Sequence, residues 1–223
     1  MTISELGIIA KANGLSLSEE QLAKLSMYAE LLHAKNQVVN LISRKDEENI
    51  LSKHILHSLT LIFPNVPLAG IPQNAKVFDL GTGGGLPGIP VKIARPDISL
   101  LLCDSIAKKI NAASEIVTSL GLTNMEARTA RAEVLATQDR FRHKYDTVVT
   151  RAVAPLDELS AWSRDLLKKG GMILALKGGN LEEEKKKVRS LKFIRSVEEE
   201  SLHLEGYDEF MKEEKKIVRV TLV

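Results

Sequence analysis

The chain of 223 residues contains a single cysteine, no long apolar run and almost no net charge. One cysteine excludes an internal disulfide and any zinc site built from several cysteines. No apolar run approaches the ~20 residues that a membrane-spanning helix needs. The first residues, Met1 to Glu5, lack the basic and apolar regions of a secretory signal. We therefore expect a cytoplasmic protein that does not associate with membranes.

The charges are nearly balanced, with 31 Lys and Arg residues against 29 Asp and Glu residues. A formal net charge of +2 neither requires nor excludes a nucleic-acid partner, because recognition depends on how the charges are distributed. Hydrophobic residues make up 44% of the chain, which is enough for a sizeable core. The length fits one α/β domain with an extension.

Two regions of the chain differ in pattern. Residues 1–72 are predicted to form an N-terminal helical extension, because a capping-box pattern begins at Ser18 and apolar residues recur at helical spacing. A further helix is expected after Asp46. Residues 73–223 alternate between strand and helix patterns and are predicted to form the ligand-binding core. We expect the two regions to pack together as one compact unit.

The alternating region predicts a mostly parallel, seven-stranded α/β sheet with right-handed crossovers. Strands are predicted at residues 76–80, 99–103, 125–129, 145–150, 172–177, 193–197 and 217–222. Helices are predicted at residues 87–95, 107–120, 156–168 and 180–190. In such sheets a ligand binds beyond the carboxyl ends of the strands, near the point where the strand order reverses.

A glycine-rich loop, DLGTGGGLPG at residues 79–88, directly follows the first predicted strand. Five glycines between positions 81 and 88 let the backbone turn tightly and approach a ligand closely. The helix predicted after the loop would present free backbone N–H groups at its N-terminus. Asp104, Arg131 and Arg151 also fall at or just after predicted strand ends. The topology therefore predicts one ligand site that gathers these residues.

The pattern of the loop favours S-adenosyl-L-methionine as the ligand. Residues 83–88 fit the dinucleotide pattern G-x-G-x-x-G, but the acidic Asp79 stands before three alternating glycines, Gly81, Gly83 and Gly85. An acidic residue there suits a cationic amino group and a sulfonium, and it suits a pyrophosphate poorly. Asp104, 25 residues further on, could accept hydrogen bonds from the ribose hydroxyls of either cofactor. A nicotinamide or flavin nucleotide, or a loop without a ligand, stays an alternative.

Two motifs that identify other methyl acceptors are missing. Methylation of exocyclic amines often uses an N-P-P-aromatic loop after the fourth strand, where residues 150–155 read TRAVAP. Methylation of pyrimidine carbon needs a thiolate, but the only thiol, Cys103, stands in a predicted strand and is expected to be a small buried side chain. An acceptor that is already nucleophilic remains. Guanine N7 is such an acceptor, because its methylation needs in-line positioning and no general base.

Several short motifs, spread over nearly the whole chain, are similar to those of a known protein family. They are NLIS at 40–43, KHILHS at 53–58, residues 79–90, RPD at 95–97, DS at 104–105, RAE at 131–133, RA at 151–152 and ALKG at 175–178. With these segments the chain resembles the bacterial 16S rRNA guanine-N7 methyltransferases of the GidB/RsmG type. The continuation LPGIP at residues 86–90 is more specific than a generic cofactor loop.

The resemblance implies a Rossmann-like class I methyltransferase that moves a methyl group from S-adenosyl-L-methionine to N7 of one guanine in 16S rRNA. It implies that Gly81 and Leu86 contact the cofactor and that Ala132 and Glu133 flank its adenine. It implies that Arg151 lies at the cofactor and the target base, and that Lys177 and Arg131 lie around the mouth of the site. We expect these three to position the acceptor, in a monomer that needs no metal.

The substrate implied by the resemblance is 16S rRNA as naked RNA, as the small subunit or as an assembly intermediate. The chain departs from the family pattern at His57, where Asp is frequent, and at Gly84, where Pro is frequent. It also reads KKINAA at residues 108–113 where the family often has KRxxFL. These departures bear on helix packing and RNA contact.

Simpler interpretations exist for several of these residues. Arg151 would be costly to bury alone, so it needs either a ligand or a salt bridge with Asp157 or Glu158. Two histidines three residues apart, His54 and His57, could share a metal, but no third ligand is evident and we expect a buried histidine. Opposite charges at helical spacing over residues 182–187 predict a solvated helix face.

The alternative functions are a methyltransferase with a protein or small-molecule acceptor, a nicotinamide-dependent oxidoreductase, and a non-enzymatic RNA-binding module. Arg131 could equally be a surface residue near Glu133. The basic segment at residues 140–144, RFRHK, could contact phosphates or form an ordinary exposed loop.

Overall fold

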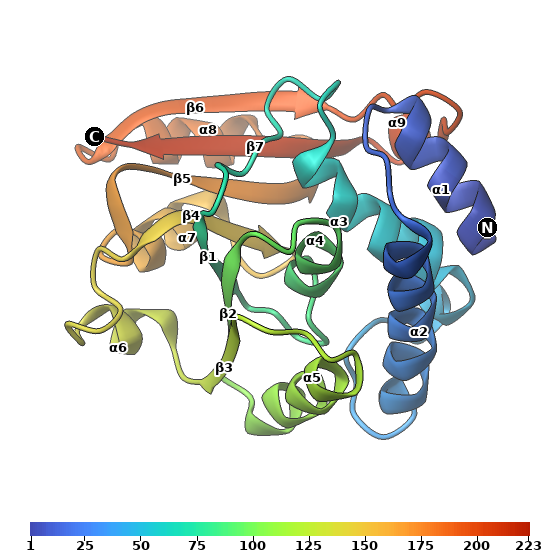
Figure 1. Cartoon of the computed structure of the whole chain (residues 1–223). Helices are drawn as coiled ribbons and strands as arrows, with labels where there is room; N and C mark the ends of the chain where they lie inside the picture. Colours follow the sequence, from blue (N-terminus) through green and yellow to red (C-terminus); the bar gives the residue numbers. More distant parts are fainter.

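A single seven-stranded sheet runs through the molecule in the order β3-β2-β1-β4-β5-β7-β6 (Figure 1). The computed structural model describes all 223 residues. The neighbours from β3 to β5 are parallel, and β7 runs antiparallel between β5 and β6. The strands are β1 (Lys76–Leu80), β2 (Ser99–Asp104), β3 (Met125–Thr129), β4 (Tyr145–Arg151), β5 (Leu167–Gly178), β6 (Ile194–Ser201) and β7 (Lys215–Leu222). The predicted mostly parallel seven-stranded sheet is confirmed.

Helices cover both faces of this sheet (Figure 1). The longer helices are α1 (Ile3–Ala12), α2 (Glu19–Asn36), α4 (Gly88–Ala94), α5 (Ala107–Ser119), α7 (Leu156–Ser163) and α8 (Glu182–Arg189). The shorter helical pieces are η1 (Arg44–Asn49), η2 (Ile50–Leu56), α3 (His57–Leu59), η3 (Thr60–Ile62), α6 (Ala132–Ala136) and α9 (Glu209–Lys212). None of the helices combines the length and apolar character of a membrane-crossing helix.

Two hydrophobic clusters fill the layers above and below the sheet. Successive side chains of a strand point to opposite faces, so Val77 of β1 belongs to one cluster and Phe78 to the other. The larger cluster holds 37 buried residues from the N-terminal helices, α4, α5 and the sheet. The smaller cluster holds 22 residues and lies beneath α6, α7 and α8. β1 is therefore buried on both faces, as a central parallel strand should be.

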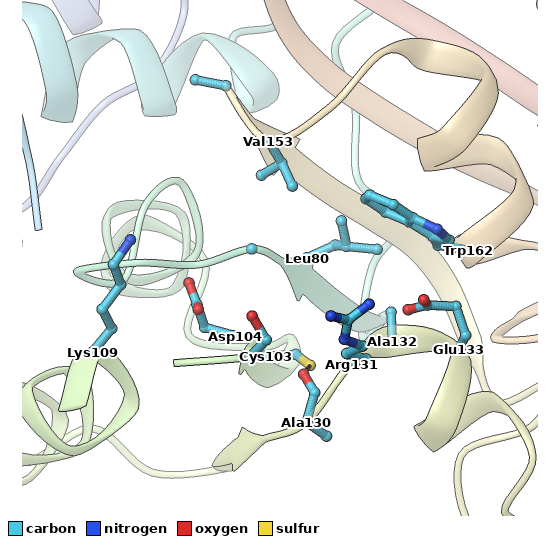
Figure 2. Close-up of a pocket in the computed structure, with 13 residues that line it drawn as sticks. Leu80, Cys103, Asp104, Lys109, Ala130, Arg131, Ala132, Glu133, Val153 and Trp162 are labelled. Atoms are coloured by element: carbon cyan, nitrogen blue, oxygen red, sulfur yellow. Dashed lines mark hydrogen bonds between the residues drawn. The ribbon is translucent and has the colours of Figure 1, made fainter. Parts of the chain in front are cut away.

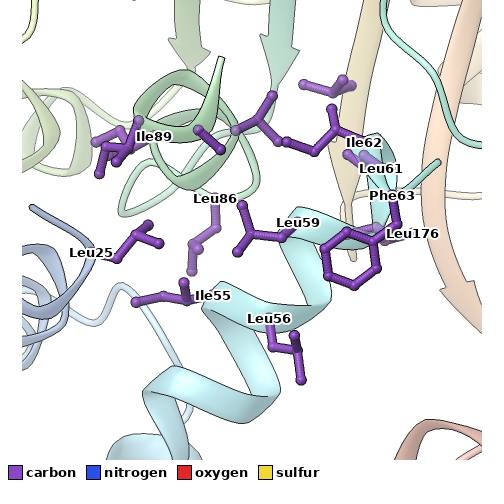
Figure 3. Packing of buried hydrophobic residues seen from close by; sticks show 14 of the residues in the cluster. Leu25, Ile55, Leu56, Leu59, Leu61, Ile62, Phe63, Leu86, Ile89 and Leu176 are labelled. Carbon is purple, nitrogen blue, oxygen red and sulfur yellow. The ribbon is translucent and has the colours of Figure 1, made fainter. Parts of the chain in front are cut away.

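The N-terminal helices pack directly against the glycine-rich region. Ser18 forms the predicted capping box with Gln21 at the start of α2. Figure 3 shows Leu25 of α2 and Ile55 and Leu59 of the following helical segment facing Leu86 and Ile89. The N-terminal helices and the glycine-rich loop thus contribute side chains to the same hydrophobic cluster.

The helix expected after Asp46 has a different form. Its residues are divided among η1, η2, α3 and η3, and η2 is a π-helical segment. All side chains from His54 to Phe63 are buried. A segment covered on all sides has no single apolar stripe, which is why spacing at 3.6 residues could not describe it.

The helix predicted at residues 156–168 was too long. It ends at Ser163, and β5 begins at Leu167, earlier than the predicted start at residue 172. Leu166 and Leu167 are both buried in the smaller cluster, and Leu167 pairs with Tyr145 of β4. Their apolar character therefore belongs to a strand and not to a helix face. The sixth strand begins at Ile194, one residue later than predicted, and extends to Ser201, beyond the predicted end at residue 197. The short helices α6 and α9 were not predicted.

Candidate functional site

Asp79 organises the glycine-rich loop from inside. Its side chain is fully buried at the end of β1. Oδ2 accepts hydrogen bonds from Thr82 Oγ1 at 2.6 Å and from Gly88 N at 2.9 Å, while Oδ1 has no partner. A Cβ at Gly88 would lie 2.5 Å from Oδ2, so only glycine fits there. Burial raises the pKa of Asp79 from 3.8 to about 7 against the opposing effect of the two hydrogen bonds.

The loop that follows β4 lies on the glycine-rich loop. Gly81 has φ +72°, a backbone conformation that disfavours any side chain. Its N–H donates to the Cys103 carbonyl at 2.9 Å, which ties the loop to β2. The side chain of Val153 occupies the space where a Cβ of Gly81 would stand. Glycine at position 81 therefore allows the glycine-rich loop and the loop after β4 to approach each other closely.

A cavity of about 330 Å³ opens at the carboxyl ends of β1, β2, β3 and β4 (Figure 2). This volume lies within the range of about 300–1,000 Å³ that small-molecule sites usually have. The polar and charged side chains that line it are Asp104, Ser105, Lys109, Arg131 and Glu133, together with Trp162 of α7. The cavity lies next to β1 and β4, where the strand order reverses, as the topology predicted.

Asp104 connects the cavity to the glycine-rich loop. Its Oδ2 accepts a hydrogen bond from Gly83 N at 3.1 Å, and its Oδ1 accepts one from Ile106 N at 2.9 Å. Each carboxylate oxygen has a second lone pair, so both can still accept from a ligand hydroxyl. An adenosine ribose presents two such hydroxyls. The two acceptor oxygens of Asp104 therefore fit the adenosine part of S-adenosyl-L-methionine.

The structure brings five of the predicted site residues into this cavity. They are Gly81, Asp104, Arg131, Ala132 and Glu133. Arg131 and Glu133 are exposed and flank the buried Ala132 at the start of α6. Figure 2 shows these side chains on the same side of the cavity as Trp162.

Other predicted site residues lie beside the cavity or behind it. Gly83 and Gly85 belong to the loop, and Leu86 is buried in the larger hydrophobic cluster, where it faces Leu59 (Figure 3). Asp79 shapes the loop and does not line the cavity. These residues set the backbone path of the loop.

Arg151 points toward the N-terminal helical segment. Strand alternation places it on the face of β4 that carries Val149, which belongs to the larger cluster. Its Nη2 contacts Nδ1 of His54, and its Nη1 is buried without a partner. The alternative salt bridge with Asp157 or Glu158 is not formed; Asp157 Oδ1 is itself unpartnered. Burial lowers the pKa of the guanidinium, which nonetheless stays charged.

Lys177 holds the segment that follows Arg151. Its Nζ donates to the Ala154 carbonyl at 2.8 Å and to Glu184 Oε2 at 2.8 Å. The same Glu184 oxygen accepts from the Leu156 backbone N–H at 2.9 Å. Lys177 and Glu184 thus clamp both sides of Pro155. The prediction of a solvated face on α8 was wrong for Glu184, because the Leu156 backbone N–H and the partly buried ammonium of Lys177 both donate to its carboxylate.

The chemistry of the remaining candidates is limited. Cys103 is buried, and burial raises its pKa to about 12, so it is a thiol at neutral pH and not a nucleophilic thiolate. His54 and His57 are both buried, and no three His, Cys, Asp or Glu side chains come together that could hold a metal ion. Sequence reasoning missed Trp162 and Val153 at the cavity. Trp162 is the only tryptophan of the chain, which was the one available signal.

Residues 21–211 match the family model of GidB, described as rRNA small subunit methyltransferase G. The chain belongs to the GidB family. A relative named ribosomal RNA small subunit methyltransferase G from Chlorobium luteolum is 46% identical over 176 residues, which cover 79% of this chain and 70% of the relative. A relative of the same name from Clostridium novyi is 36% identical over 181 residues, which cover 81% of this chain and 73% of the relative.

Solved structures with low sequence identity share the fold. A predicted O-methyltransferase from Agrobacterium tumefaciens superposes with a TM-score of 0.57 at 12% identity, covering 76% of this chain and 80% of that one. TrmN from Thermus thermophilus superposes with a TM-score of 0.53 at 18% identity, covering 76% of this chain and 49% of that one. The GidB-family chain is therefore a methyltransferase with a Rossmann-like class I fold, and the resemblance seen in its sequence is confirmed.

Proposed function

We propose that this protein transfers a methyl group from S-adenosyl-L-methionine to N7 of a guanine in 16S ribosomal RNA. The proposal rests on the cavity at the strand ends, which gathers Gly81, Asp104 and Glu133 beside a loop braced by Asp79. Membership of the rRNA small subunit methyltransferase G family supports RNA of the small subunit as the acceptor.

In this site each residue has a definite task. Gly81 allows close backbone approach, Asp104 accepts hydrogen bonds from the ribose hydroxyls, and Ala132 with Glu133 flanks the adenine. Asp79 and Gly88 keep the loop in shape. When bound, the cofactor supplies an electrophilic methyl group on a sulfonium. Arg151, Arg131 and Lys177 act by positioning, directly at the acceptor or through the loop after β4.

Guanine N7 suits a site that has no activated nucleophile and no histidine in its cavity. N7 carries a lone pair and no proton, so it could accept the methyl group that the bound cofactor would supply, and no residue would have to remove a proton. The protein therefore contributes alignment of the two reactants, and it needs no metal.

Transfer of labelled methyl groups to undermodified 16S rRNA tests the proposal. Naked RNA, small subunits and assembly intermediates serve as separate substrates, and reduction followed by aniline cleavage locates any 7-methylguanosine. Label in one guanine of the RNA is the expected result. Label found only in protein or small molecules would refute the RNA acceptor, and label at another RNA position would refute N7.

A binding measurement separates the cofactor classes. Trp162 lines the cavity and is the sole tryptophan, so its fluorescence should respond when S-adenosylhomocysteine binds. Tight binding of a nicotinamide nucleotide without binding of S-adenosyl-L-methionine would overturn the methyltransferase assignment. Binding of RNA without methyl transfer would instead indicate a binding module.

A further inference from the structure

The buried guanidinium of Arg151 is held by a side chain from the N-terminal helical segment. Nη2 of Arg151 contacts Nδ1 of His54, which lies 97 positions earlier in the sequence, in η2. His54 is only 3% exposed. No carboxylate pairs with Arg151, and its Nη1 has no partner in the protein. The orientation of this cation therefore depends on one imidazole.

The chemistry of the contact fixes the protonation of His54. A guanidinium only donates hydrogen bonds, so in this contact we assign Nδ1 as the acceptor and place the proton on Nε2, which is buried without a hydrogen-bond partner. Burial, together with the charge of Arg151, lowers the pKa of His54 to about 3, which keeps the ring neutral at physiological pH. The other charged groups that face the ring, Asp46, Lys53 and Lys215, partly offset one another.

A neutral acceptor differs from the carboxylate that usually accompanies a buried arginine. A carboxylate would orient the guanidinium but would also neutralise it. An imidazole orients it and leaves the positive charge uncompensated, so the charge remains available to an acceptor atom of a ligand. Arg151 ends β4 directly before Ala152 and Val153, which line the cavity, but its own side chain is not part of the lining.

We propose that His54 is a positioning residue that holds Arg151 in place for methyl transfer while leaving its positive charge unpaired. This role rests on the function proposed above. It also gives the N-terminal helical segment a direct part in the site, beyond packing. The adjacent His57 provides a contrast, because it is equally buried but has no hydrogen bond and packs on the ring of Phe210, with centroids 5.0 Å apart.

Three variants test the proposal in the full-length protein. His54→Leu removes the acceptor, His54→Asn keeps an acceptor oxygen close to the position of Nδ1, and His57→Leu is the control for loss of a buried histidine. His54→Leu should lower kcat for methyl transfer about 10- to 100-fold, as expected for loss of a hydrogen bond to a charged group. Its affinity for S-adenosylhomocysteine should change less than about threefold, because neither His54 nor Arg151 lines the cavity at the strand ends.

His54→Asn should recover most of the rate, and His57→Leu should retain it. Equal loss of rate in His54→Leu and His57→Leu would show that only core packing matters. No loss in His54→Leu would also overturn the proposal. A wild-type rate that falls at low pH with a midpoint near that of free histidine, and no longer falls in His54→Asn, would show a titrating His54 and contradict the neutral acceptor.

Nitrogen NMR of the imidazole rings provides a readout that does not need RNA. The expected tautomer of His54 has Nε2 protonated and Nδ1 unprotonated, and the Nδ1 shift should change in Arg151→Met. A protonated Nδ1 would overturn the proposal even if methyl transfer is confirmed. Absence of methyl transfer by the wild-type protein, with the expected tautomer present, would instead count against the proposed function.

Discussion

Replacing Asp79 by asparagine should remove a pH-dependent loss of stability that originates inside the glycine-rich loop. The carboxyl group is fully buried, and burial raises its pKa from 3.8 to about 7. The unfolded chain therefore releases this proton near pH 3.8, whereas the folded protein retains it until about pH 7. The contribution to stability is fully present below the lower value and is lost as the pH rises through the higher one.

The size of this effect follows from the gap between the two pKa values. About three pKa units, at about 1.4 kcal/mol per unit, correspond to about 4 kcal/mol. An asparagine oxygen can still accept from Thr82 and Gly88, but it carries no charge. Its amide nitrogen, placed near the unpartnered Oδ1 position, adds a cost that does not depend on pH. Between about pH 4 and pH 8, the free energy of unfolding of Asp79→Asn should therefore rise by about 4 kcal/mol relative to wild type.

Urea unfolding at a series of pH values, followed by Trp162 fluorescence, measures this difference. His54 and His57 have lowered pKa values, so their stabilising contribution is present above the ordinary histidine pKa and is lost as the pH falls. Both histidines are present in both proteins, and their effect cancels in the difference. A difference that stays constant over the pH range would refute the raised pKa. If the wild-type protein instead gained stability relative to Asp79→Asn at high pH, the ionised carboxylate would be stabilising the loop.

Further variants test the geometry of the site. Gly88→Ala places a Cβ 2.5 Å from Asp79 Oδ2, and urea unfolding should show a loss of about 1–3 kcal/mol; unchanged stability would mean that the loop adapts freely. Asp104→Ala should weaken S-adenosylhomocysteine binding about tenfold or more in fluorescence titrations. Lys177→Ala should impair methyl transfer more than it impairs this binding. Equal losses of affinity in the two variants would contradict the role of Lys177 as a positioning residue. In a double-mutant cycle on methyl-transfer rate, Lys177→Met and Glu184→Gln should couple by about 0.5–3 kcal/mol, and additive effects would exclude a shared clamp.

The central part of the fold could be predicted because its signals are local. β1 and β3 have the predicted ends. β1 is a short apolar run bounded by turn residues, and β3 directly follows the turn residue Asn124. The predictions were wrong for two apolar segments whose spacing does not indicate which element they form. Residues 54–63 are covered on all sides, and Leu166 with Leu167 is buried by pairing with β4, so neither segment carries the spacing of its true structure.

Part of the site could be predicted from the sheet topology, whereas the rest depends on contacts between distant residues. Asp104 and the segment from Arg131 to Glu133 follow strands, and the carboxyl ends of parallel strands share one edge of the sheet. Their grouping in one cavity therefore follows from topology. The partners of Arg151 and Lys177 depend on contacts between residues far apart in the chain, or on which side of a charged helix faces inward. His54 carries no motif that would assign it to Arg151, and Glu184 stands in a run of identical charges.

Gly84 shows how closely the N-terminal helices and the glycine-rich loop depend on each other. A Cβ at this position would lie 2.6 Å from Leu32 Cδ1 and 3.2 Å from Leu41 Cβ. The hydroxyl of Tyr28, fully buried in α2, donates to the Gly84 carbonyl at 3.0 Å. The departure from proline at this position thus accompanies a close approach of α2 to the loop, because a ring at Gly84 would need the space that Leu32 occupies. The backbone of the glycine-rich loop is therefore shaped from one side by Asp79 and from the other by α2, and the helical region contributes to the geometry of the proposed cofactor site.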